Sequence, residues 1–542
     1  MLFNSYEFIF AFLPLVTAGF FLLGGLSRTL ALRWLILASL FFYAWWRPFN
    51  VLLIAPSILV NFVLARTLQR LGRADRPRTS MAVLILGIAF NIAFLSYFKY
   101  TNFFGGAIND VFGTHWVLTE IILPLGISFI TFQKIAFLVD LHAGRIESFT
   151  LQDYCLFVLF FPQLIAGPIV HYREMMPQFH GATCRFDKEN VAVGLTLFLF
   201  GLFKKAVLAD GLAPHVSMIY GEAAAGTGIS LITAWMAAIG FTLQIYFDFS
   251  GYTDMALGAA RLFGIRLPQN FNSPLQSSSI IDFWLRWHMT LTRFLTAYIY
   301  NPLVLALTRR RMARGLPGFG GHQTTLGAFV QLLAFPTMLT MFISGLWHGA
   351  GYGFVLWGLL HGAYLTIDHA WRLRGPRLWP DRRSYERVMK PLGLVLTFTA
   401  VVTSMVLFRS ATVAGALDIL RGMIGLNGVS VPETVFERFA PLAPLLERIG
   451  VVQQSWGGRG FLILAALIPA LVFIALACPN TLQLLARFEP ALGVRQRPTE
   501  PSLAGRLLEW APSLAWSIGM SAIAIAGILS LGGPSEFLYW QF

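Results

Sequence analysis

Long apolar stretches recur along the whole chain, and each has the length that an α-helix needs to cross the hydrocarbon core of a membrane, roughly 20 residues. A further apolar run at 154–170 contains two prolines and a glycine within 161–168, which favours a re-entrant segment. The sequence therefore predicts an all-α, polytopic transmembrane helical bundle of about 11–13 spans with re-entrant segments around a central channel. The predicted spans lie near 6–26, 31–46, 50–66, 81–98, 120–139, 191–209, 230–248, 284–307, 326–346, 353–371, 391–408, 461–478 and 513–531.

The composition indicates a membrane protein and argues against a soluble or nucleic-acid-binding one. Of the 542 residues, 56% are hydrophobic and only 12% are charged, whereas soluble domains are roughly 25% charged. The net charge of +14 is explained by basic cytoplasmic loops, so no nucleic-acid partner is predicted. Three widely spaced cysteines indicate neither a metal site nor a disulfide framework. The N-terminus lacks the basic region of a cleavable signal, so we expect the first apolar run to be retained as a span.

Basic residues concentrate in four short loops, and the positive-inside rule places such loops in the cytoplasm. The mixed-charge stretch 427–459, the N-terminus and the tail 535–542 are then expected outside. Between 140 and 309 the number of predicted crossings does not agree with the sidedness assigned from the basic loops. At least one of 154–170, 191–209 and 284–307 is therefore not a simple span. The basic loops are 66–78, 309–314, 372–390 and 487–506.

The chain shows no internal repeat and no polar stretch long enough for a soluble domain. We therefore predict one integral-membrane domain over 1–542. Residues 412–425 have amphipathic spacing and are expected to lie in the membrane interface.

The stretch 344–358 combines an ionisable residue with many glycines. It is mostly apolar, and its 15 residues include His348 and five glycines. Glycine disfavours helix interiors by about 1 kcal/mol relative to alanine, so the stretch predicts a broken helix or a close backbone approach. Because ionisable groups at membrane depth are costly, they are functional candidates by default. We predict that His348 lies in a cavity and acts chemically, although a buried histidine that joins helices through a backbone carbonyl is the simpler alternative.

A second polar cluster lies at 282–302. Asp282 and Arg286 have the spacing of a favourable helical ion pair, and Arg293 is expected two turns further along the same face. His288 is expected on a different face, in register with Trp284. His288 is interpreted either as a residue that lines the site or as a packed interfacial residue.

Two further clusters are more economically explained as structural. Asp248 and Asp254 are acids in an apolar setting, and we expect them to pair with an arginine, since buried acids need partners; a direct role is the alternative. The arginines considered are Arg261, Arg266 and Arg286. In the predicted span at 120–139, Ser128, Thr131, Gln133 and Lys134 are expected to join helices by hydrogen bonds.

Several enzyme signatures are absent from the sequence, namely the G-x-S-x-G elbow, H-E-x-x-H, the P-loop and G-x-G-x-x-G ahead of a helix. Two histidines are too few for a structural zinc site, so no metal is predicted. His361 and His369 follow His348 on the next helix and are expected to be peripheral.

These clusters, taken in order, resemble the membrane-bound O-acyltransferase family, and within it the membrane subunits of bacterial alginate and exopolysaccharide O-acetyltransferases. The resemblance covers nearly the whole chain and includes the aromatic C-terminal tail. Its motifs are Phe3-Asn-Ser-Tyr-Glu-Phe-Ile-Phe, Pro124-Leu-Gly-Ile-Ser-Phe, Phe161-Pro-Gln-Leu-Ile-Ala-Gly-Pro168, Asp248-Phe-Ser-Gly-Tyr-Thr-Asp254, Phe271-Asn-Ser-Pro274, Asp282-Phe-Trp-Leu-Arg-Trp-His288 and Trp347-His-Gly349.

The resemblance implies an O-acyltransferase of the bacterial inner membrane. The invariant histidine of the family falls on His348 and its second, more variable polar position on His288, and both are predicted to be catalytic. Acetyl-CoA is the implied cytoplasmic donor, with no permanently bound cofactor. The implied acceptor is an extracytoplasmic polysaccharide such as alginate, reached with a periplasmic partner protein. Donor binding is predicted for Arg286, Trp287, Arg293 and Asn301.

Two other classes of function compete with acyl transfer. Secondary transporters also contain broken helices and ionisable groups near the midplane, although these usually occur as paired interruptions in two repeats. A non-catalytic scaffold for polysaccharide secretion would tolerate the replacement of His348.

Overall fold

The computed structural model describes residues 1–114, 121–181, 184–319, 324–379, 381–438, 440–448, 450–455, 457–494, 509–533 and 538. Within these residues, nine helical segments are long and apolar enough to cross a membrane, and each overlaps a predicted span. The prediction of an all-α polytopic bundle is confirmed. The segments are Glu7–Leu26, Phe49–Gly72, Pro77–Asn109, Lys188–Ala225, Leu231–Leu262, Leu326–His348, Arg382–Arg409, Gly458–Ala477 and Leu514–Gly532.

The other four predicted spans take different forms. Helices α2 (Arg28–Ala44) and α5 (Ile127–His142) are present but shorter, with 17 and 16 residues. Helix α17 (Tyr352–Leu378) is continuous over 27 residues, and its second half is rich in polar side chains. The prediction of an uninterrupted helix over 284–307 is wrong, because the chain breaks between α12 (Ile280–Trp284) and α13 (Met289–Leu295).

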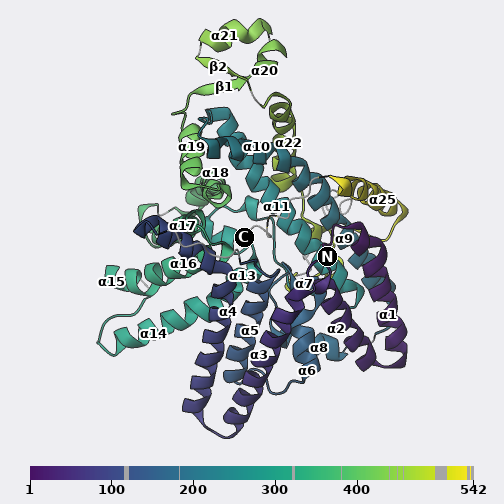
Figure 1. The fold of residues 1–542 in the computed structure, drawn as a ribbon. Helices are drawn as coiled ribbons and strands as arrows, with labels where there is room; N and C mark the ends of the chain where they lie inside the picture. Colours follow the sequence, from purple (N-terminus) through teal and green to yellow (C-terminus); the bar gives the residue numbers. More distant parts are fainter. Residues whose placement is uncertain are drawn as a thin grey trace. The chain divides into compact units, whose positions relative to one another are not determined.

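The first of two compact units comprises Met1–Lys205, Ser250–Asn270 and Thr481–Gly532. Helices α3, α4 and α5 lie side by side in it (Figure 1). Its main elements are a π-helical turn Glu7–Phe12, α1 (Leu13–Leu26), α2, α3 (Phe49–Arg73), α4 (Pro77–Phe112), α5, α6 (Leu151–Leu159), α7 (Phe161–Leu164), α8 (Tyr172–Gly181), α9 (Lys188–Phe203), the C-terminal part of α11 (Leu231–Leu262), α23 (Thr481–Leu484) and α25 (Leu514–Leu529).

Polar side chains inside this unit link helices. Lys134 of α5 donates a hydrogen bond from Nζ to the Ser57 hydroxyl of α3 at 2.6 Å and lies over the ring of Phe94 in α4. This contact agrees with the prediction that the polar residues of α5 join helices. Ser128, Thr131 and Gln133 are buried on the same helix.

The expected arginine partner of Asp254 is wrong. Asp254 instead pairs with Lys204 at 2.6 Å, and both side chains are largely buried. Asp248 is buried in α11. The arginines considered as partners pair with other acids, namely Arg261 with Glu189, Arg266 with Glu489 and Arg286 with Asp282. The error arose because composition indicates that a buried acid needs a cation but does not say which helix supplies it.

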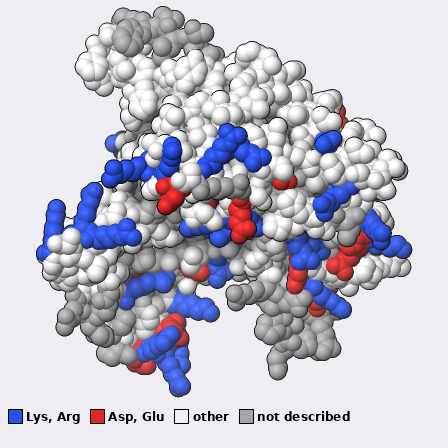
Figure 2. Space-filling model, turned by 90° about the horizontal axis from the view of Figure 1, so that it is seen from below, with Lys and Arg blue, Asp and Glu red and all other residues white. Residues whose placement is uncertain are grey.

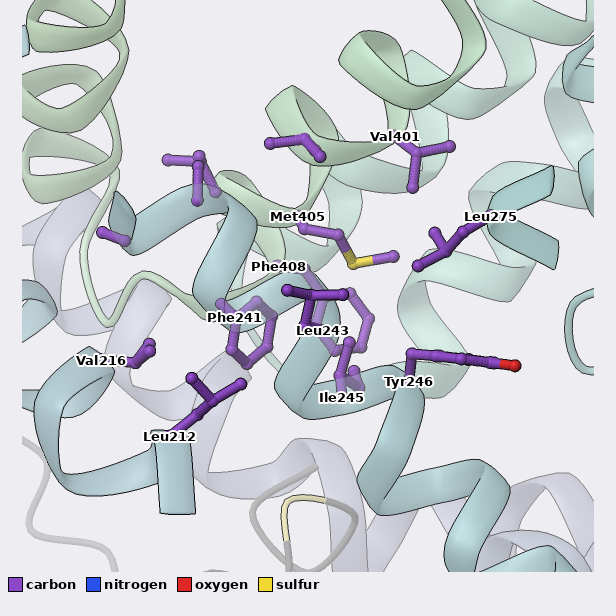
Figure 3. Packing of buried hydrophobic residues seen from close by; sticks show 14 of the residues in the cluster. Leu212, Val216, Phe241, Leu243, Ile245, Tyr246, Leu275, Val401, Met405 and Phe408 are labelled. Atoms are coloured by element: carbon purple, nitrogen blue, oxygen red, sulfur yellow. The ribbon is translucent and has the colours of Figure 1, made fainter. Parts of the chain in front are cut away.

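The second unit comprises Ala206–Phe249, Phe271–Asn480 and Gly533–Phe542. Its core is apolar and draws on α10, α11 and α18, as the packing of Val216, Phe241, Met405 and Phe408 illustrates (Figure 3). Its main elements are α10 (Asp210–Ala225), the N-terminal part of α11, α12, α13, a π-helical turn Thr296–Tyr300, α14 (Asn301–Met312), α15 (Leu326–Phe329), a π-helical turn Val330–Ala334, α16 (Phe335–His348), α17, α18 (Arg382–Arg409), α19 (Val413–Met423) and α22 (Gly458–Ala477).

A small lobe of the second unit lies between α19 and α22. Strands β1 (Val429–Pro432) and β2 (Val451–Gln454) pair in parallel and, with α20 (Glu433–Arg438) and α21 (Ala443–Arg448), enclose Val431, Phe436 and Val451 (Figure 1). The amphipathic spacing at 412–425 is confirmed as helix α19, whose apolar side packs on α10 and α18.

The face shown in Figure 2 exposes basic side chains among mostly uncharged residues and some acids. The sidedness assigned from the basic loops stays a prediction. The second half of the loop 487–506 and most of the tail 535–542 lie outside the described residues.

Candidate active site

His348 is the last residue of α16, where the chain leaves one helix and enters the next. Gly349 and Gly351 have extended backbone conformations, and α17 begins at Tyr352. The predicted break in the glycine-rich stretch is confirmed, and it lies directly after the histidine. His348 is 4% exposed, so the break places a buried imidazole at the end of a helix.

Two glycines bring α16 and α17 into backbone contact. A Cβ added at Gly345 would lie 2.3 Å from the Phe354 carbonyl oxygen, and one at Gly358 would lie 2.4 Å from the Met341 carbonyl oxygen. No side chain fits at such distances unless the backbone moves. The close packing of the two helices (Figure 1) therefore fixes the end of α16, which carries His348.

The second candidate, His288, lies at a helix break of a different kind. Helix α12 ends at Trp284, and α13 begins after His288, which adopts the left-handed conformation with φ 43° and ψ 51°. The Thr292 hydroxyl donates a hydrogen bond to the Trp284 carbonyl oxygen at 3.1 Å and so bridges the break. A left-handed backbone costs an L-residue roughly 1–2 kcal/mol, so the surrounding packing must hold His288 in place.

This break corrects the face assignments made for 282–302. The expected ion pair is confirmed, since Arg286 Nε lies 2.9 Å from Asp282 Oδ1. The assignment of Arg293 to the same face as Arg286 is wrong, because the helix is interrupted between them. The expected register of His288 with Trp284 fails for the same reason.

Aromatic rings enclose both histidines and connect them. The Phe249 ring of α11 meets His288 edge-to-face, with 4.8 Å between ring centres, and the Trp357 ring of α17 meets His348 in the same way at 5.1 Å. Trp347 contacts both, with its ring centre 6.1 Å from His288 and 4.8 Å from His348. The structure thus brings the two predicted catalytic residues into contact with one indole, although they lie 60 positions apart in sequence.

The residues predicted to bind the donor differ in how exposed they are. The Arg286 side chain is 32% exposed and Asn301 is exposed at the start of α14. Trp287 is buried against Phe271 and Phe283. Exposure and burial alone do not test donor binding, so this assignment stays a prediction.

A cavity of about 270 Å³ lies between α12, α13, α16 and α17. Its lining is mainly apolar, with threonine hydroxyls, one tyrosine and one histidine. Met341 lies two helical turns before His348 on α16. The lining residues are Ile281, Trp284, Leu285, Thr292, Leu295, Thr296, Tyr300, Thr337, Thr340, Met341, Leu365 and His369.

The expectation that His361 is peripheral is wrong. Its side chain is fully buried, its Nδ1 accepts a hydrogen bond from Trp284 Nε1 at 3.3 Å, and its Nε2 lies 2.9 Å from the Ser404 hydroxyl. His369 lines the cavity. The one sequence signal for this arrangement is that His361 follows Trp357 by four residues, on the same face of a helix; the partners on α12 and α18 could not be read from spacing.

Fold and site together define a multi-pass membrane protein with two buried histidines held at helix breaks around a shared tryptophan. The model of the membrane-bound O-acyltransferase family matches residues 143–316. A peptidoglycan O-acetyltransferase of Helicobacter pylori is 39% identical over 461 residues, which is 80% of this chain and 81% of that protein. A probable alginate O-acetylase of Pseudomonas aeruginosa is 37% identical over 434 residues, 79% of this chain and 75% of that protein.

A more distant relative is a teichoic acid D-alanyltransferase of Streptococcus thermophilus, which is 27% identical over 293 residues, 52% of this chain and 68% of that protein. The chain belongs to the membrane-bound O-acyltransferase family and is an O-acyltransferase. Family membership favours the enzyme over the transporter and the secretion scaffold.

Proposed function

We propose that the enzyme transfers an acetyl group from cytoplasmic acetyl-CoA to hydroxyl groups of an extracytoplasmic polysaccharide, in the bacterial inner membrane. Relatives named for the acetylation of peptidoglycan and alginate support this class of acceptor. The observation that carries the proposal is the placement of His348 at the end of α16, buried, and facing the same indole as His288.

In this proposal His348 is the general base. A neutral ring nitrogen takes the proton from the acceptor hydroxyl while the hydroxyl oxygen attacks the thioester carbonyl carbon. The new C–O bond forms, the C–S bond breaks, and the imidazolium returns its proton to the departing thiolate. His288 orients the donor or binds the acceptor. A positioned base contributes roughly 10²–10⁴-fold to the rate.

The donor is proposed to bind both through its phosphates and through its acyl-bearing arm. Arg286 and Arg293 meet the phosphates of coenzyme A, because guanidinium groups pair well with phosphate, and Trp287 and Asn301 complete that site. The acyl-bearing arm occupies the cavity beside Met341, which lies roughly 10 Å from His348 along the axis of α16. Because the cavity is mainly apolar, it suits an uncharged arm better than the phosphates.

We further propose that a periplasmic partner protein carries the acetyl group from the membrane to the polymer. The chain contains no serine-nucleophile motif of its own, so the accepting hydroxyl can belong to such a partner. Acetyl analysis of the polymer in cells that contain or lack the candidate partner tests this step separately from the chemistry in the membrane.

The decisive experiment measures transfer of radiolabelled acetyl from acetyl-CoA in membranes that contain wild type, His348→Ala or His288→Ala at matched expression. We expect His348→Ala to lose nearly all transfer while its thermal unfolding in detergent stays close to wild type. His215→Asn on α10 is the matched control, because this histidine lies outside the site. Near-normal transfer by His348→Ala would refute the proposal.

A further inference from the structure

We infer that His361 is a positioning residue for acyl transfer, which joins the two helix breaks that carry His288 and His348. The inference rests on the proposed function, because it concerns the geometry of the same two histidines. It adds a role that His361 performs through Trp284 and Trp357 and without touching either substrate.

The hydrogen bonds of His361 determine its tautomer. An indole N–H can only donate, so the 3.3 Å contact from Trp284 Nε1 requires an unprotonated Nδ1 on His361. The neutral ring then carries its proton on Nε2, which donates to the Ser404 hydroxyl at 2.9 Å. Ser404 in turn donates to the Val401 carbonyl oxygen at 2.7 Å. The Trp284 N–H, both ring nitrogens of His361 and the Ser404 hydroxyl therefore each have a hydrogen-bond partner, as buried polar groups generally do.

The chain of hydrogen bonds connects three helices. Trp284 is the last residue of α12, His361 lies within α17, and Ser404 lies within α18. Trp284 precedes His288 by only four residues, so anchoring its indole fixes the helix end from which the left-handed turn at His288 departs. Because that turn is strained, its position depends on contacts of this kind.

The ring of His361 also supports His348. Its centre lies 4.8 Å from the centre of the Trp357 ring, and Trp357 also makes the edge-to-face contact with His348. The rings of Trp284 and Trp357 meet with centres 5.8 Å apart. His361 thus contacts both tryptophans: Trp284, which precedes the break at His288, and Trp357, which packs on His348. A shift of the His361 ring would therefore displace the contacts of both catalytic histidines.

Two replacements separate the hydrogen bonds from the volume of the ring. His361→Asn places a carbonyl oxygen near the position of Nδ1 and can still accept from Trp284. His361→Gln places an amide nitrogen near Nε2 and can still donate to Ser404. Together with His361→Ala they are assayed for kcat and for the KM of acetyl-CoA, with His215→Asn as the control.

Since small displacements of reacting groups can cost about 10²-fold, we expect kcat of His361→Ala to fall at least about tenfold with KM little changed. His361→Asn should recover more of kcat than His361→Gln, because it keeps the bond to α12. In a double-mutant cycle, Trp284→Phe and His361→Ala should be non-additive in kcat, since both remove the same bond. Should His361→Ala not fold, the ranking of Asn over Gln and the cycle of Trp284→Phe with His361→Gln, which also removes the bond from Trp284, carry the test.

The inference is overturned if the His361 variants keep wild-type kcat, if only KM changes, or if Asn and Gln lose kcat equally. In those cases an inactive His348→Ala would leave the proposed function standing. If His348→Ala itself retains transfer, the proposed function fails and the positioning role fails with it.

Discussion

The two breaks that hold the histidines are built in opposite ways. After His348 the chain stops being helical because glycines follow it, and the histidine keeps an ordinary helical backbone. At His288 no glycine is present, and the histidine itself adopts the left-handed conformation. One break is therefore made by the residues next to the functional side chain, and the other by the functional residue.

This difference predicts how each break responds to substitution. At the first break, side chain and backbone can be changed separately, because His348 contributes only its imidazole. At the second, any replacement of His288 alters both the ring and a backbone conformation that most residues disfavour. Substitutions at each break test this contrast.

The largest effect is expected for His348→Ala. Loss of the base should lower kcat by roughly 10²–10⁴-fold, while the free energy of unfolding changes little beyond the loss of packing against Trp357 and Phe408. Transfer assays on membranes, with thermal unfolding of the purified protein, measure the two quantities. A variant that loses activity only in proportion to its folded fraction would contradict a separate role for the side chain.

His288 gives the sharpest test of the contrast. His288→Ala and His288→Gly both remove the ring, but glycine adopts φ 43° without strain. We expect His288→Gly to be more stable than His288→Ala by about 1 kcal/mol, with a similar loss of kcat in both. Equal unfolding temperatures would show that the left-handed backbone at 288 does not limit stability.

The sequence predicted the first break better than the second for a physical reason. Glycines mark sites of close approach, and the positions that matter, Gly345 and Gly358, lie in the stretch that the sequence singled out. A left-handed histidine leaves no such mark, so 284–307 reads as one helix. Long apolar stretches likewise predicted the spans well, since length and hydropathy are local properties. The contacts of His361 and the Lys204 partner of Asp254 were missed because both join residues that are distant in sequence.

The helix contact beside the first break should be sensitive to a single methyl group. Gly345→Ala or Gly358→Ala forces a Cβ against a backbone carbonyl oxygen, and overpacking of this kind costs roughly 1–3 kcal/mol. Gly221→Ala in α10 is the control, because nothing lies within 4 Å of its added Cβ. Thermal unfolding of the three variants measures the difference, and equal stability would show that α16 and α17 can separate without cost.

The smallest effect is expected at the ion pair that precedes the second break. Asp282 and Arg286 are each about one-third exposed, and pairs of this kind contribute roughly 0–1 kcal/mol. Asp282→Asn keeps the shape of the side chain and should change the unfolding temperature little.

The same replacement, Asp282→Asn, leaves Arg286 without its carboxylate and so frees the guanidinium for a phosphate. If Arg286 binds the donor, the KM for acetyl-CoA should fall or stay constant in Asp282→Asn and rise in Arg286→Gln, with kcat unchanged in both. A loss of kcat in Asp282→Asn would instead mean that the pair holds the turn at His288, and that the second break depends on α12 as strongly as the first depends on its glycines.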